Sequence, residues 1–169
     1  MALSKINTQN HCVIEAPFGC LGIMTEASID GLILSKIEFL PATTPLSEPH
    51  DELAMLVAKH CKTYFKNPTF QFEFDKLPTK IVGTEHQQKV WKFIRDIPSG
   101  STVTYGEIAS AIGSGARVVG SACGANPFPI ITPCHRVVSA QGIGGFMKEN
   151  SPGIYREIKS WLLKHEGSL

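Results

Sequence analysis

The stretch 104-TYGEIASAIGSGARVVGSACGA-125 decides the fold that we predict for the second half of this 169-residue chain. Thr104 stands three residues before Glu107, which is the capping-box spacing that begins a helix. The link Gly113–Gly115 then ends that helix, and a second short helix rich in small residues follows over residues 116–125. Two short helices joined by a glycine-bearing turn are typical of a helix-turn-helix. Helix pairs that never meet DNA have the same pattern, so this stretch alone leaves both interpretations open.

Helical periodicity continues on both sides of this stretch. Apolar residues recur every three or four positions over residues 85–97 and again over residues 155–165, as in helices with one buried face. The turn Pro98-Ser99-Gly100 ends the first of these two helices. We therefore expect the second half of the chain to be mostly helical.

The first part of the chain has a different character. Three short apolar segments within residues 11–40 are separated by turn sequences, which predicts a small antiparallel sheet built from hairpins. Residues 52–65 have the spacing of an amphipathic helix. Residues 69–74 alternate as in a strand, with three phenylalanines on one face.

A proline and a change of composition within residues 75–83 mark the boundary between these two parts. We expect an α+β protein with a small N-terminal α/β domain, residues 1–79, followed by a mostly helical C-terminal domain, residues 80–169. The first holds six Lys or Arg against nine Asp or Glu, and the second holds ten against six. The second domain is therefore the better candidate for contact with a polyanion, although a solvated surface explains so small an excess equally well.

The overall composition excludes several classes of protein. With 43% hydrophobic and 18% charged residues, the chain is typical of a folded globular protein, and no apolar run approaches the roughly 18 residues that a membrane span needs. No secretory signal is recognisable, so we expect a cytoplasmic protein with no membrane partner. The five cysteines are scattered and include no C-x-x-C pair. This pattern favours reduced thiols over a disulfide framework or a zinc site.

Residues 131–138, Ile-Thr-Pro-Cys-His-Arg-Val-Val, set a thiol beside an imidazole and a guanidinium. Neighbouring cations lower the pKa of a cysteine, which is normally about 8.5, and so increase its thiolate fraction. Pro133 restricts its own backbone and that of the preceding residue, so the thiol of Cys134 extends from a stiff segment. A buried structural cysteine in a short strand is an equally good interpretation of these residues alone.

Seven short segments follow one another in an order that is far more specific than any one of them. They are Gly83-Thr84, Val90-Trp91, Thr102–Ala109, Ala116–Gly120, Asn126-Pro127, Pro133–Val137 and Trp161–Gly167. In this order they resemble the O6-alkylguanine-DNA alkyltransferases, also called methylated-DNA–protein-cysteine methyltransferases. The first 80 residues carry no motif of comparable strength, and their position and α/β pattern assign them to the family's variable N-terminal domain.

The resemblance implies a catalytic set of Cys134, His135, Glu166 and Tyr105. Cys134 matches the residue that accepts the alkyl group and is consumed in one turnover, because the thioether formed has no easy leaving group. His135 matches the residue that takes the thiol proton through a water, and Glu166 matches the carboxylate that orients this imidazole. Tyr105 matches the tyrosine that donates a hydrogen bond to the departing guanine. Taken alone, Glu166 also fits a solvated helix end and Tyr105 a core position.

The resemblance also implies a partner, double-stranded DNA that carries O6-alkylguanine and is bound through the minor groove with little dependence on sequence. The guanine has to leave the base stack to reach a buried thiol, and Arg117 matches the side chain that fills the gap. An ordinary phosphate contact would explain Arg117 as well. The other residues expected at the DNA are Gly120, Ser121, Ala122 and Asn126, although small residues also serve tight helix packing. We expect the protein to act as a monomer.

The substrate pocket implied by the resemblance is lined by Pro133, Asn126 and Phe146. The loop Gly142–Gly153 departs from the family's pattern, because Phe146 comes one residue early and additional residues separate it from the last helix. The altered length leaves open which larger alkyl groups fit.

Some members of the family bind zinc in the N-terminal domain, but His11, Cys12 and Cys20 do not reproduce that site. We therefore expect no metal and no cofactor. Two other functions remain open. One is recognition of alkylated bases without repair, against which Cys134 argues because such proteins lack the cysteine. The other is a hydrolase with a Cys-His-Glu triad, which would need an oxyanion hole and multiple turnovers.

Overall fold

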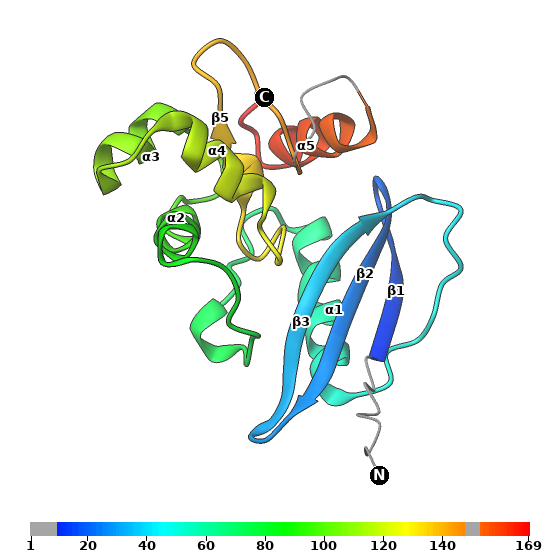
Figure 1. The fold of residues 1–169 in the computed structure, drawn as a ribbon. Coiled ribbons are helices and arrows are strands. Elements are labelled where there is room, and N and C mark those ends of the chain that lie inside the picture. Colours follow the sequence, from blue (N-terminus) through cyan, green and yellow to red (C-terminus); the bar gives the residue numbers. More distant parts are fainter. Residues whose placement is uncertain (1–9, 148–152) are drawn as a thin grey trace.

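The computed structural model describes residues 10–147 and 153–169. Figure 1 shows two groups of elements. A three-stranded sheet with helix α1 on one face forms the first group, and helices α2, α3, α4 and α5 gather beside it as the second. One hydrophobic core runs through both groups. Within the described ranges, none of the helices has the length and hydropathy needed to cross a bilayer.

The sheet consists of β1 (Asn10–Ala16), β2 (Gly19–Ser28) and β3 (Gly31–Leu40), antiparallel and in chain order. Two tight hairpins join the strands, as the sequence predicts. Gly19 has φ +139°, and a Cβ there would lie 2.9 Å from the Leu40 carbonyl oxygen. Only glycine tolerates such a backbone at this turn.

Helix α1 (Glu52–Lys66) covers one face of the sheet. It begins at Asp51, whose side chain accepts a hydrogen bond from the Ala54 amide at 2.8 Å, and Thr25 on β2 donates to the same carboxylate. An N-cap of this kind stabilises a helix by about 1 kcal/mol. The apolar face of α1 packs on the sheet, which confirms the predicted amphipathic helix.

The strand predicted over residues 69–74 is absent, and this prediction is wrong. Residues 69–73 have no regular structure, and Phe74–Lys76 forms a short 3-10 helix, η1. The segment cannot add to the sheet next to β3 at Leu34, because the Leu34 backbone is already hydrogen-bonded there to Pro78 and to Lys80. Phe70 and Phe72 instead pack edge to face on each other and contact rings of α1, and Phe74 packs against Phe128.

The helical group begins with α2 (Glu85–Arg95), followed by the short strand β4 (Val103–Thr104), α3 (Tyr105–Ile112) and α4 (Ala116–Gly124). The predicted capping box is confirmed. The Thr104 side chain accepts from the Glu107 amide at 3.1 Å, and the Glu107 carboxylate accepts from the Thr104 amide at 2.7 Å. Gly113 ends α3 with φ +69° and turns the chain into α4.

The segment after α4 returns to the start of the helical group, where it pairs with β4. Cys134–Arg136 forms a 3-10 helix, η2, and β5 (Val137–Val138) then pairs in parallel with β4. The last helix, α5 (Ile154–His165), packs against η2. The pairing of β4 with β5 brings the start of α3 close to Cys134, which positions the site described next.

Candidate active site

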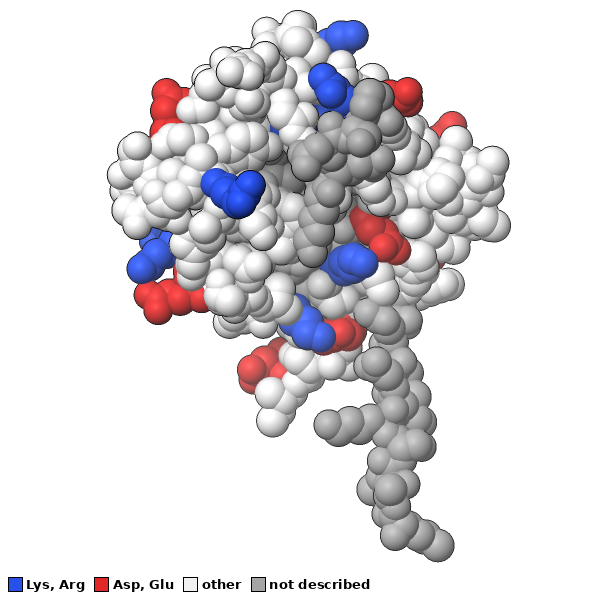
Figure 2. All heavy atoms as spheres, turned by 45° about the horizontal axis from the view of Figure 1, so that its top comes forward, with Lys and Arg blue, Asp and Glu red and all other residues white. Residues whose placement is uncertain are grey.

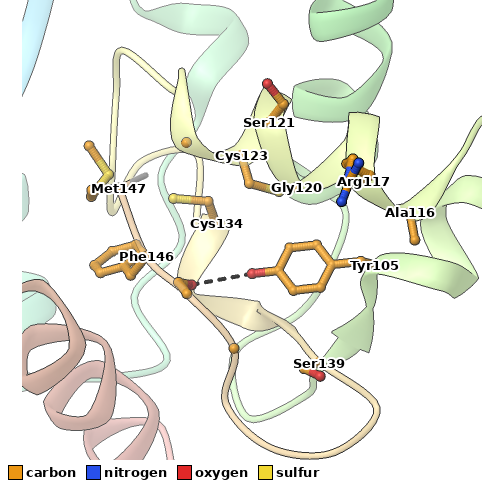
Figure 3. A pocket seen from close by; sticks show the side chains of 13 residues that line it. Tyr105, Ala116, Arg117, Gly120, Ser121, Cys123, Cys134, Ser139, Phe146 and Met147 are labelled. Atoms are coloured by element: carbon orange, nitrogen blue, oxygen red, sulfur yellow. Dashed lines mark hydrogen bonds between the residues drawn. The ribbon is translucent and has the colours of Figure 1, made fainter. Parts of the chain in front are cut away.

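Cys134 is the first residue of η2, and only 2% of its surface is exposed. It lines a cavity of about 580 Å³ between the α3–α4 pair and residues 144–147. Figure 3 shows its side chain between Phe146 and Met147 on one side and Tyr105 on the other. The rest of the cavity wall comes from Ala116, Arg117, Gly120, Ser121, Cys123, Gly124, Ser139, Gly144 and Gly145.

Asn126 braces the segment that carries this thiol. Its amide nitrogen donates to Cys134 Sγ at 3.2 Å and to the Thr132 carbonyl at 2.7 Å, and its amide oxygen accepts from the Phe128 amide at 3.0 Å. Every polar atom of this buried side chain therefore has a protein partner. The segment is held in one conformation as a result.

Burial raises the pKa of the Cys134 thiol, and the hydrogen bond from Asn126 and the positive charge of Lys159 only partly oppose this. The adjacent side chains of His135 and Arg136 both bind Glu166. The expectation that the neighbouring His135 and Arg136 lower the pKa of Cys134 is therefore wrong. Cys134 rests as a thiol and needs a base to become a nucleophile.

His135, Arg136 and Glu166 form a buried charge network. Nε2 of His135 lies 2.9 Å from Glu166 Oε1, and Arg136 grips both oxygens through Nη2 at 2.8 Å and Nε at 3.0 Å. Arg136 also donates to the Ile97 carbonyl at 2.6 Å. Burial would raise the pKa of Glu166, but the hydrogen bonds from His135 and Arg136 outweigh it and lower this pKa to about 2.

The ionised carboxylate determines which nitrogen of His135 carries the proton. A carboxylate can only accept, so Nε2 of His135 must be the donor in this pair. Burial lowers the pKa of His135 more strongly than Glu166 raises it, so the ring is neutral and Nδ1 keeps its lone pair. Nδ1 is buried and makes no hydrogen bond within the described part of the chain. A buried neutral imidazole with a free lone pair is equipped to act as a general base.

Tyr105 and Lys159 share one acceptor at the cavity wall. The Tyr105 hydroxyl donates to the Gly145 carbonyl at 3.2 Å, and Lys159 Nζ donates to the same oxygen at 2.8 Å and to the Val137 carbonyl at 2.7 Å. Lys159 is fully buried, and burial lowers its pKa to about 8. It holds the segment carrying Gly145 against β5.

The structure brings most of the residues predicted from the sequence to this one site. Tyr105, Cys134 and Phe146 line the cavity, and Arg117, Gly120 and Ser121 line it from α4. His135 and Glu166 are buried and do not line the cavity.

Three of the predicted contact residues are buried and do not line the cavity. Ala122 is 1% exposed and its carbonyl accepts from the Trp91 indole at 2.8 Å, so its side chain faces the core and not the outside. Asn126 is 4% exposed and turned toward the backbone of its own segment. Pro133 is buried behind Cys134, and neither Pro133 nor Asn126 lines the cavity. The role as pocket lining or DNA contact predicted for these three side chains does not agree with their burial.

Two residues of the site escaped the sequence analysis. Lys159 carries a signal that was available, because it lies on the same helical face as Ile158 and Leu162 and is therefore directed into the core. Tyr64 lies on the apolar face of the helix predicted over residues 52–65, but nothing in that pattern indicates that its hydroxyl donates to Glu166 Oε1, 102 residues away, at 2.8 Å.

Comparison with known proteins identifies the family. Residues 85–168 match the family described as 6-O-methylguanine DNA methyltransferase, DNA binding domain. A methylated-DNA–protein-cysteine methyltransferase of Methanosarcina acetivorans is 34% identical over 166 residues, which cover 94% of this chain and 98% of that protein. This chain belongs to the methylated-DNA–protein-cysteine methyltransferases.

Other relatives and solved structures agree with this membership in the methyltransferase family. The methyltransferase of Shigella flexneri is 46% identical over 97 residues, which cover 56% of this chain and 54% of the Shigella protein, so this match spans only about half of that relative. The Mycobacterium tuberculosis O6-methylguanine methyltransferase has a TM-score of 0.76 at 32% identity, covering 95% of this chain and 94% of that one. The Mycobacterium tuberculosis OGT crystallised in complex with DNA has a TM-score of 0.72 at 33% identity, covering 94% and 93%.

Proposed function

We propose that this chain repairs DNA by direct reversal, transferring the alkyl group of O6-alkylguanine to the sulfur of Cys134. The observation that carries the proposal is that Cys134 lines a cavity of about 580 Å³ and that the next residue of η2, His135, is buried and paired with Glu166 at 2.9 Å. A weak nucleophile, a base and a group that orients the base are the parts that covalent catalysis needs.

The proposed transfer begins with removal of the proton from the Cys134 thiol. His135 Nδ1 takes the thiol proton of Cys134 through a water, and Glu166 stabilises the imidazolium that results. The thiolate attacks the alkyl carbon, so that a C–S bond forms as the C–O bond to guanine breaks. The electron pair of the broken bond goes to the guanine, and Tyr105 stabilises the developing charge by hydrogen bonding. The thioether on Cys134 is not hydrolysed, and each molecule acts once.

A guanine inside a duplex cannot reach this thiol, so the proposal includes base flipping. Arg117 lies at the start of α4 and lines the cavity, where its side chain is suited to fill the gap left by the base. The pair α3–α4 then acts as the helix-turn-helix, with Gly120 and Ser121 facing the minor groove. Residues 80–169 serve as the DNA-binding and transfer domain, and residues 1–79 as the smaller N-terminal domain, of a protein that acts as a monomer.

The distribution of Lys and Arg on the surface determines how strongly salt should affect DNA binding. Figure 2 shows a face on which Lys and Arg side chains are separated from one another and interspersed with Asp and Glu. A surface of this kind neutralises few phosphates, and each phosphate contact contributes about −0.9 to the slope of log affinity against log salt. We therefore propose shallow salt dependence, with the inserted Arg117 and the flipped base contributing much of the affinity.

The direct test is intact-mass spectrometry of the protein after incubation with a short duplex that contains O6-methylguanine. We expect a gain of one methyl group on the peptide containing Cys134, stopping at one equivalent. Binding of the duplex without any gain in mass would instead indicate a protein that recognises the lesion without repairing it. Repeated turnover on an ester substrate would indicate a hydrolase.

A further inference from the structure

A tyrosine from the N-terminal half of the chain contacts the proposed proton relay. Tyr64 lies near the end of α1 and is 1% exposed. Its hydroxyl donates to Glu166 Oε1 at 2.8 Å, and its backbone carbonyl accepts from His165 Nε2 at 2.7 Å. Side chain and backbone of one residue thus attach the end of α5 to α1.

This contact completes the surroundings of a single oxygen atom. Oε1 of Glu166 is the acceptor for Tyr64, for His135 at 2.9 Å and for Arg136 Nη2 at 2.8 Å. A carboxylate oxygen offers about two lone-pair sites, so three donors saturate it. The carboxylate cannot rotate away from His135 without breaking at least two other hydrogen bonds.

The saturated oxygen also affects where the proton resides. Each donor withdraws charge from Oε1, and a carboxylate with less charge is a poorer acceptor of a full proton. The proton on Nε2 of His135 therefore stays on the ring, and Nδ1 remains the basic nitrogen. Tyr64 remains a donor throughout the working pH range, because burial and the adjacent Glu166 raise the pKa of its hydroxyl.

We propose that Tyr64 is a positioning residue for alkyl transfer, which acts through Glu166 to fix the orientation and basicity of His135. The inference rests on the proposed function and deepens it, because it assigns to α1 a part in the relay. A merely structural tyrosine would change the stability of the protein and leave the ionisation of His135 unaltered.

The titratable and charged groups that face Tyr64, Glu166 and His135 are the side chains of Arg136, Lys159, Cys61 and His165. Arg136 and Lys159 are cationic and favour a neutral His135. Removing the Tyr64 hydroxyl leaves both in place, so a change in the ionisation of His135 reports on the hydroxyl itself.

The test is the variant Tyr64→Phe, which keeps the ring and removes the donor. Glu166 then presents more charge to His135, so the imidazolium is more stable and the pKa of His135 rises. We expect the acid limb of the pH–rate profile for alkyl transfer to move to higher pH. We also expect the rate on its plateau to fall about tenfold, a fraction of the roughly 100-fold or more that a positioned general base contributes. Titration of the His135 ring by NMR measures the same shift without DNA.

Phe72→Leu is the matched control. The Phe72 ring packs against Tyr64 with centroids 5.8 Å apart, and it makes no hydrogen bond to Glu166 among those of the described residues. This control is expected to lower thermal stability and to leave the pH profile in place. A Tyr64→Phe protein that behaves like Phe72→Leu, with unchanged rate and unchanged His135 titration, overturns the role of Tyr64.

Two further experiments distinguish failure of the proposed function from failure of the role of Tyr64. Wild-type protein is assayed first, because the absence of any methyl gain overturns both the proposed function and this inference, whereas normal wild-type transfer with an unaffected Tyr64→Phe overturns the inference alone. Should Tyr64→Phe not fold, 3-fluorotyrosine at position 64 replaces it. Its hydroxyl is a stronger donor, so the acid limb must then move to lower pH, and an unmoved limb overturns the inference.

Discussion

The two halves of the chain bury different kinds of side chain. Among the described residues, the buried polar groups of the sheet and α1 are the neutral Thr25 and Ser35, and the remainder of that core is apolar. The helical half buries His135, Lys159 and Glu166, all of them ionisable. Burial of a charge is costly unless the charge is paired and hydrogen-bonded.

From this difference we infer that the helical half carries the proposed chemistry and that the sheet with α1 mainly stabilises the fold. All three ionisable groups lie within one connected set of contacts around Cys134, whereas the sheet supplies a packed support. Tyr64 is the exception, because it reaches from α1 into that set. The following predictions test this division of roles, from the largest expected effect on alkyl transfer to the smallest.

Cys134→Ser removes the acceptor sulfur, and we expect complete loss of alkyl transfer with folding and DNA binding retained. Intact-mass spectrometry and gel-shift assays measure the two properties. Cys20→Ser is the matched control in the sheet, since its hydroxyl can use the Ala42 and Thr44 carbonyls that lie near Cys20 Sγ. A Cys134→Ser protein that still removed methyl groups from DNA would refute the proposed acceptor.

Glu166→Gln keeps the shape of the side chain and removes its charge, so the imidazolium of His135 loses its stabilising partner. We expect transfer to slow by about 100-fold, which is within the range of general acid–base contributions. Single-turnover rates on the folded variant provide the measurement. Glu157→Gln, an exposed carboxylate on the same helix, should react at the wild-type rate, and equal losses in both variants would argue against the relay.

Arg117→Ala tests base flipping. The variant loses the side chain that would fill the gap in the stack, where unpairing a base costs a few kcal/mol. We expect repair of duplex DNA to fall roughly tenfold more than reaction with free O6-benzylguanine. Lys92→Ala, on the exposed side of α2, provides the comparison for a lost positive charge. Equal losses on both substrates would contradict the role of Arg117.

Leu21→Ala tests whether the sheet contributes to stability without contributing to alkyl transfer. Leu21 in β2 is fully buried, and its truncation is expected to cost about 2–5 kcal/mol of unfolding free energy. The methyl gain per folded molecule should stay at one equivalent and the transfer rate should not change. Urea unfolding and intact mass give the two readings, and a folded variant with slow transfer would show that the sheet does more than support the site.

Acid should weaken the folded state through Glu166 without altering transfer at neutral pH. The pKa of Glu166 is depressed from 4.5 to about 2, so its contribution to stability is present above pH 4.5 and is lost as the pH falls toward 2. The expected loss is about 2 kcal/mol by pH 3, and the full loss of about 3 kcal/mol is reached only below pH 2. Urea unfolding between pH 7 and pH 3 measures it, and the dependence should flatten in Glu166→Gln. Identical slopes in the two proteins would argue that other carboxylates dominate.

Local patterns in the sequence predicted an element well wherever the residues that stabilise it lie within the same short segment. The capping box at Thr104, the αL turn at Gly113 and the hairpins of the sheet all depend on residues a few positions apart. The prediction of a strand over residues 69–74 was wrong. Alternation indicates which side chains share one face, but it does not supply a neighbouring strand to pair with, and the nearby edge at β3 was already bonded to residues 78–80.

The site could be predicted only in part for a similar reason. Motif resemblance pointed to Cys134, His135 and Glu166 together, although the last two lie 31 positions apart along the chain. It did not reveal that Ala122 and Asn126 face inward, because side-chain direction depends on what packs against a helix or turn. Nor did it reveal the buried contacts of Lys159 and Tyr64.

The sequence alone predicted the hairpins of the sheet, the five helices, the reactive segment around Cys134 and the family to which they point, because capping, turn geometry and periodicity act over short distances. Only the tertiary structure decided how the thiol is controlled. Burial raises the pKa of Cys134, and the hydrogen bond from Asn126, which follows α4, partly opposes this rise. The orientation of His135 depends on Glu166, which follows α5 and is bound by Tyr64 of α1. These are long-range packing effects, and they arise when segments up to 102 residues apart meet in one core.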